Sequence, residues 1–124
     1  MSEGAVRKSG IFFAHEVARK SQFEMISDGI DTLTEGGFLL AAAPTGIGKT
    51  AAALASALQA SFDNNLATEK PKIIFMTGRQ SQHRIVVDTV RQINSRIPEG
   101  IPKITLIDII GREGMCEYLS LIHI

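Results

Sequence analysis

Apolar residues recur at helical spacing in three stretches of the chain. The first helix is expected to begin after an N-cap at Ser21 and to end at the Gly36–Gly37 pair. The second is expected over residues 50–62 and the third over residues 82–97. Within each helix the apolar positions lie three or four residues apart, as one buried face requires. They are Phe23, Ile26, Ile30 and Leu33, then Leu54, Leu58 and Phe62, then Val86, Val90, Ile93 and Ile97.

Short apolar runs alternate with these helices, at residues 38–42, 72–77 and 104–110. Each run is typical of a strand that is buried on both faces. Strands alternating with helices predict an α/β fold, a parallel sheet with helices on both faces. In such a sheet ligands bind beyond the carboxyl ends of the strands. Three segments would lie there, at residues 43–50, 78–83 and 111–116.

Composition sets broad limits on the function. The chain has 124 residues, 44% of them hydrophobic and 21% charged, which is typical of one globular domain after a polar tail at residues 1–10. The net charge of zero gives no bulk signal for nucleic acid. Cys116 is the single cysteine, so an internal disulfide is excluded, and no apolar run is long enough to span a membrane. We therefore expect a soluble, cytoplasmic chain without a membrane partner.

The most informative motif lies between the first apolar run and the second helix. It consists of Ala43, Pro44, Thr45, Gly46, Ile47, Gly48, Lys49 and Thr50. The glycines allow the backbone to curl around an anion, and the helix that follows directs N–H groups toward it. Lys49 can reach the terminal phosphates of a nucleotide, and the Thr50 hydroxyl can coordinate Mg²⁺. The motif predicts a phosphate-binding loop (P-loop) for ATP, and the alternative is a chance glycine turn.

Two further groups of polar residues offer contacts to ligands. The Gln22 amide suits the edge of adenine, and Arg19 could stack on the base or pair with phosphate, although both also fit an exposed helix start. The segment 77–84 is rich in donors that hold a nucleic-acid backbone, or it is a polar surface loop. Its candidate contacts are Thr77, Arg79, Gln80, Gln82 and His83.

Taken together, these segments resemble the archaeal XPD-type DNA helicases, the iron–sulfur branch of superfamily 2. Phe13 through Gln22 resembles the family's entry segment and adenine-contacting motif, and residues 43–50 resemble its motif I, in which alanine at the first position is common. Residues 77–84 are similar to its motif Ia, and residues 110–116 to the segment with the first cysteine ligand of a [4Fe–4S] cluster. The resemblance covers residues 11–118.

The resemblance implies an ATP-dependent 5′-to-3′ DNA helicase that moves on single-stranded or forked DNA as a monomeric motor. Residues 11–118 would be the N-terminal part of its first RecA-like domain. Lys49 and Thr50 would serve phosphate chemistry and Mg²⁺ binding, and Arg19 and Gln22 would contact the nucleotide. Residues 77–83 would grip DNA, and Cys116 would hold the cluster. On sequence alone Cys116 is an ordinary thiol.

The chain departs from the family in ways that limit its expected activity. Three of the four cysteines, the Asp-Glu-x-His motif and the second motor domain are missing, so hydrolysis is expected to be negligible. Residues 119–124 match the translation of a transposase end sequence used for sequencing libraries, and native sequence is expected to stop at Tyr118. Two alternatives remain, a different P-loop enzyme such as a small-molecule kinase and a non-catalytic nucleotide-binding module.

Overall fold

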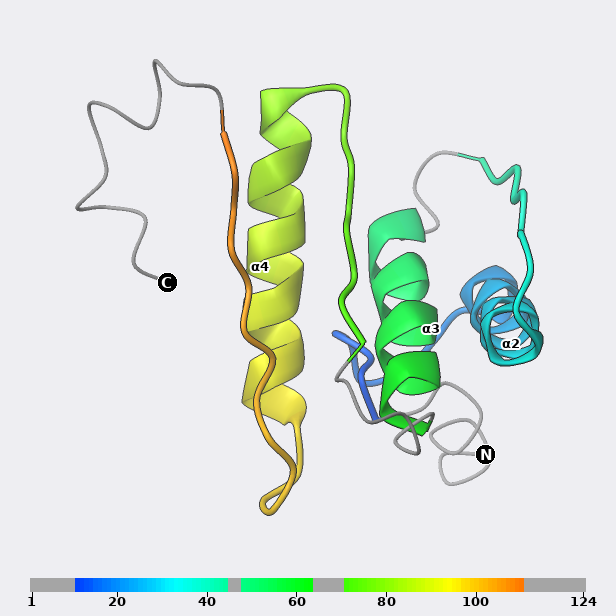
Figure 1. Cartoon of the computed structure of the whole chain (residues 1–124), viewed down its shortest axis with the longest axis horizontal. Helices are drawn as coiled ribbons and strands as arrows, with labels where there is room; N and C mark the ends of the chain where they lie inside the picture. The colour runs from blue at the N-terminus through cyan, green and yellow to red at the C-terminus, as the bar shows by residue number, and fades with distance from the viewer. Residues whose placement is uncertain (1–10, 45–47, 64–70, 111–124) are drawn as a thin grey trace.

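Three helices form the framework of the molecule. The structure is a computed structural model that describes residues 11–44, 48–63 and 71–110. Its helices are α2 (Lys20–Glu35), α3 (Lys49–Asp63) and α4 (Gln80–Arg96), so the three helices predicted from apolar spacing are confirmed. Figure 1 shows α3 and α4 upright and α2 seen along its axis. Within these described ranges no helix has both the length and the apolarity needed to cross a bilayer.

The start of α2 differs from the prediction. Arg19, not Ser21, is the N-cap, and the Gln22 Oε1 atom accepts a hydrogen bond from the Arg19 backbone N–H at 3.1 Å. A glutamine three residues after the N-cap satisfies the backbone N–H of the N-cap residue in this way, so the predicted cap at Ser21 is wrong by two residues. The predicted end of the helix is confirmed, because Gly36 follows Glu35 with a left-handed φ of 79°.

One hydrophobic core joins the N-terminal segment to all three helices. Ile26 of α2 and Ile93 of α4 are its two fully buried large side chains. Phe12 adds an edge-to-face contact with Phe62 of α3, with ring centroids 5.5 Å apart. The buried cluster comprises Phe12, Phe13, Ala14, Ile26, Ala51, Ala52, Leu54, Ala55, Val86, Val90 and Ile93. The predicted inward faces of α2, α3 and α4 are all represented in it.

Helices α2 and α3 approach each other most closely at Gly29. A Cβ atom at this position would lie 2.7 Å from both Cβ and Oγ of Ser56 in α3. The contact needs a residue without a side chain on α2 and a small residue on α3. The alanine-rich sequence of α3 serves the same close packing, and its residues Ala51, Ala52 and Ala55 are buried.

The predicted parallel sheet is wrong. Within residues 11–44, 48–63 and 71–110 the structure contains no strand, and the segments 38–42, 72–77 and 104–110 run without ladder hydrogen bonds to one another. Figure 1 shows these segments well apart, each following a different part of the helical framework. The predicted α/β fold, a P-loop NTPase or RecA-like sheet with helices on both faces, is therefore not present in the part of the chain that the structure describes.

The three apolar segments form no sheet because they contact the helices and solvent, not one another. Their side chains alternate between partly covered and bare, as at Ile73 with 39% and Ile74 with 84% exposure. Segment 104–110 is held by α4 instead of by a strand. The Asn94 side chain accepts from the Ile104 N–H at 2.7 Å and donates to the Ile104 carbonyl at 3.0 Å. One amide side chain thus supplies both hydrogen bonds that a neighbouring strand would give.

The Gly29 contact can be tested by adding one methyl group. We expect Gly29→Ala to lower the free energy of unfolding by about 1–2 kcal/mol, because the overpacking cost exceeds the gain in helix propensity. Gly78→Ala is the matched control, since a Cβ there meets nothing within 4 Å, and it should change stability by less than about 0.5 kcal/mol. Urea unfolding followed by circular dichroism measures both. A Gly29→Ala protein as stable as the parent would contradict the close crossing of α2 and α3.

Candidate functional site

The Gln22 side chain connects the starts of two helices. It is 4% exposed, and its Oε1 atom accepts from Arg19 at the beginning of α2. Its Nε2 atom donates to the Gly48 carbonyl at 3.2 Å, immediately before α3. Gln22 is therefore engaged by backbone groups on both sides. The sequence predicts that Gln22 contacts the edge of adenine, and the structure places its amide against Gly48, immediately before α3.

Gly48 forms the turn into α3. Its φ of 78° is left-handed, and its carbonyl also accepts the first helical hydrogen bond, from Ala52 N–H at 3.1 Å. A Cβ atom at this position would collide with the Gln22 Nε2 atom. Both the backbone conformation and the packing therefore require glycine here. The GKT sequence places this turn, Lys49 and Thr50 at the positive end of the α3 dipole.

Lys49 lies at the first position of α3 and is exposed. Its Nζ atom donates to the Ala43 carbonyl at 3.0 Å, which closes the loop across six residues. A phosphate oxygen would be a stronger acceptor for this ammonium than a neutral carbonyl. Thr50 follows at a half-buried position. Ala43 and Pro44 are in place before the loop, whereas the predicted contacts Thr45, Gly46 and Ile47 lie outside the described residues.

This arrangement suits an anion. The first N–H groups of a helix have no intrahelical acceptor, and the helix dipole adds partial positive charge there. The exposed ammonium of Lys49 lies at the same point.

Among the described residues no group of three or more histidine, cysteine, aspartate or glutamate side chains could hold a metal ion. Cys116, the predicted cluster ligand, lies outside those residues.

A second polar group lies at the start of α4. The Thr77 hydroxyl is 3.5 Å from the Arg79 carbonyl, and the same carbonyl accepts from Gln82 N–H at 3.1 Å. Arg79 is the extended N-cap, and the side chains of Arg79, Gln80 and Gln82 are exposed. Figure 1 shows α3 and α4 beginning at the same, upper end of the view, so both predicted groups lie on one side of the molecule.

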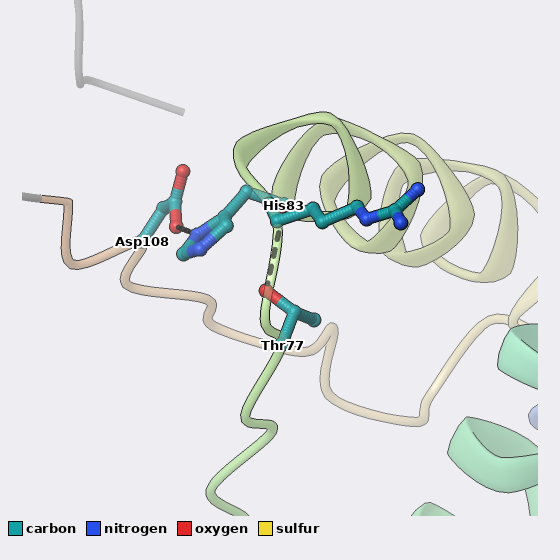
Figure 2. A network of polar contacts seen from close by, with 4 residues as sticks. Thr77, His83 and Asp108 are labelled. Carbon is teal, nitrogen blue, oxygen red and sulfur yellow. Dashed lines mark hydrogen bonds and ion pairs between the residues drawn. The ribbon is translucent and has the colours of Figure 1, made fainter.

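His83 has a partner that sequence reasoning missed. Its Nδ1 atom lies 2.8 Å from Oδ1 of Asp108, and Figure 2 shows the ring and the carboxylate facing each other from α4 and the segment 101–110. Both side chains are about one quarter exposed, at 28% and 26%. A signal for Asp108 was present, because it is the one charged residue in the apolar run 104–110. A carboxylate in such a run needs a donor nearby.

The bond between Gln22 and Gly48 can be tested with two glycines that share a left-handed φ. Gly100 has a φ of 89° and open space around it, so Gly100→Ala should cost about 1–2 kcal/mol for the backbone alone. We expect Gly48→Ala to cost about 1 kcal/mol more, because it also displaces the Gln22 amide. Urea denaturation gives both values, and adding Gln22→Ala should remove the excess. Equal costs at the two glycines would show that Gln22 does not lie against Gly48.

No family model, curated protein or solved structure matches this chain. Its possible chemistry therefore follows from the two groups of residues themselves. The first offers a helix start, a lysine and a hydroxyl to an anion at residues 48–50. The second offers a polar loop and a histidine held by a carboxylate at the start of α4.

Proposed function

We propose that the chain binds the phosphate groups of ATP at the start of α3. The observation that carries the proposal is the left-handed Gly48 turn, directly followed by an exposed Lys49 at the first position of the helix. The helix N-terminus attracts the anion, and Lys49 exchanges its bond to the Ala43 carbonyl for one to a phosphate oxygen. The proposal depends on this loop–helix junction alone and requires no parallel sheet.

Thr50 would serve the Mg²⁺ ion that accompanies ATP. A hydroxyl one position after the lysine stands beside the phosphates, where a metal ion bridging them needs an oxygen ligand. Gln22 would orient the site, because its amide donates to the Gly48 carbonyl and so sets the direction of the turn before Lys49. Arg19, exposed at the N-cap of α2, remains a candidate contact to the nucleotide base or phosphate.

The wider function that we propose is that of an ATP-dependent DNA helicase, of which this chain is the nucleotide-binding and part of the DNA-binding region. The exposed Arg79, Gln80 and Gln82, together with Thr77 and His83, would contact the backbone of single-stranded or forked DNA. Side chains of these types donate to phosphate and sugar oxygens, which suits binding without sequence preference. The [4Fe–4S] cluster on Cys116 belongs to the same proposal.

Substitution of Lys49 tests the nucleotide site. We expect Lys49→Ala to weaken binding of a fluorescent ATP analogue with Mg²⁺ by about tenfold or more, because a charged hydrogen bond to phosphate is worth about 1.5–3 kcal/mol. Lys103→Ala removes another exposed ammonium, outside the site, and should leave the affinity unchanged. Fluorescence titration of the three proteins gives the constants. Equal affinities for parent and Lys49→Ala would refute the phosphate site.

Hydrolysis by this chain alone should be negligible. These 124 residues hold no Asp-Glu pair after an apolar run to complete the metal site and orient water. Phosphate release from ATP should therefore equal the rate of the Lys49→Ala protein in the same buffer. A measured turnover that Lys49→Ala abolishes would contradict this expectation and show that the chain carries a complete catalytic site.

A further inference from the structure

Asp108 lies in a chemically unusual position for a carboxylate. Its neighbours Ile107 and Ile109 are both exposed apolar residues, at 78% and 74%, whereas the Asp108 side chain turns the opposite way, toward α4. There it meets His83 at 2.8 Å. Successive side chains of an extended segment point to opposite sides, so every second residue faces α4. At position 108 the residue that faces α4 is an acid.

The segment that carries Asp108 is fixed to α4 at two places. Asn94 binds both backbone groups of Ile104 near the end of α4, and His83 binds Asp108 in its first turns. From Asn94 to His83 the helix rises about 16 Å, and from Ile104 to Asp108 an extended chain covers about 13 Å. The two lengths agree closely enough for the segment to lie antiparallel along the helix. Asp108 is therefore held against His83 by more than its own hydrogen bond.

The contact determines which nitrogen of His83 carries a proton. An ionised carboxylate can only accept a hydrogen bond, so the Nδ1 atom must hold the hydrogen. The Nε2 atom is then the one available to a ligand. In the imidazolium form Nε2–H donates to an anionic oxygen, and the Asp108 carboxylate balances the charge of the ring. This is the arrangement by which a carboxylate orients a histidine in many functional sites.

We infer that Asp108 is a positioning residue that holds His83, through Nδ1, so that the Nε2–H of the imidazolium form faces the phosphate backbone of single-stranded nucleic acid. The inference rests on the proposed binding of DNA by residues 77–83. The inference predicts an effect on DNA affinity that is opposite to the effect expected from net charge. Removing an acid ordinarily strengthens binding to a polyanion, whereas removing this acid should weaken it.

Binding of a rhodamine-labelled oligothymidylate tests whether removing this acid weakens binding. Anisotropy is followed at fixed low salt and at about pH 5.5, where a histidine ring is ordinarily an imidazolium. We expect Asp108→Ala to bind about tenfold more weakly than the parent, the effect of losing one charged hydrogen bond to phosphate. Asp88→Ala is the control for removing an acid, because Asp88 is an exposed residue of α4 itself and pairs with Arg91 at 3.5 Å. It should bind equally well or more tightly. Asp108→Asn, which keeps an acceptor oxygen, should recover most of the affinity.

Two further measurements separate positioning from a general loss of structure. Nitrogen-15 NMR at about pH 8, where a histidine ring is ordinarily neutral, should show hydrogen on Nδ1 of His83 in the parent and a mixture of both tautomers in Asp108→Ala, with unchanged helical circular dichroism. His83→Ala should bind as weakly as Asp108→Ala, and the double variant no more weakly than either.

The outcomes distinguish this inference from the proposed function. If the parent binds the oligonucleotide and Asp108→Ala binds as tightly as Asp88→Ala, the positioning role is overturned while DNA binding stands. A parent without hydrogen on Nδ1 would overturn it as well. If the parent does not bind the oligonucleotide at all, the DNA-binding proposal fails, and the inference fails with it.

Discussion

The hydrogen bond from Gln22 to the Gly48 carbonyl is the interaction on which the arrangement of the molecule depends. It joins the first turn of α2 to the turn that starts α3, across 26 residues of sequence. A buried amide without partners would be costly, and Gln22 has partners on both sides, Arg19 and Gly48. The same bond fixes where the proposed phosphate loop ends. Fold and candidate site therefore share one buried side chain.

The helices were predictable from sequence because their signal is local. The spacing of Val86, Val90 and Ile93 identified α4 despite its many β-branched residues, and all three are buried. A helix satisfies its own backbone, so one stretch of sequence carries most of the necessary information. A strand satisfies its backbone only through a neighbour. The apolar runs showed that residues 72–77 and 104–110 would be extended, but not which groups would bind them, and the Asn94 amide took the place that a strand was expected to fill.

In the candidate sites too, local features were predictable from sequence and long-range contacts were not. The GKT sequence indicated the turn at Gly48 and the lysine at the start of α3, because the required backbone conformation depends on adjacent residues. The contact of His83 with Asp108 joins residues 25 positions apart and depends on how segment 101–110 lies along α4. No spacing rule links the two. Only the presence of an acid among isoleucines indicated that Asp108 had a partner.

The bare side chains of the extended segments have a consequence for how the molecule opens. Phe38, Leu40 and Ile74 face solvent, and their segments have no strand ladders to protect the backbone. Amide hydrogens in such segments exchange with water through small local openings, whereas those of α2, α3 and α4 exchange only when the shared core around Ile26 and Ile93 comes apart. Among the described residues, the helices α2, α3 and α4 share the buried core, and we expect them to unfold together, after the extended segments that lie along them.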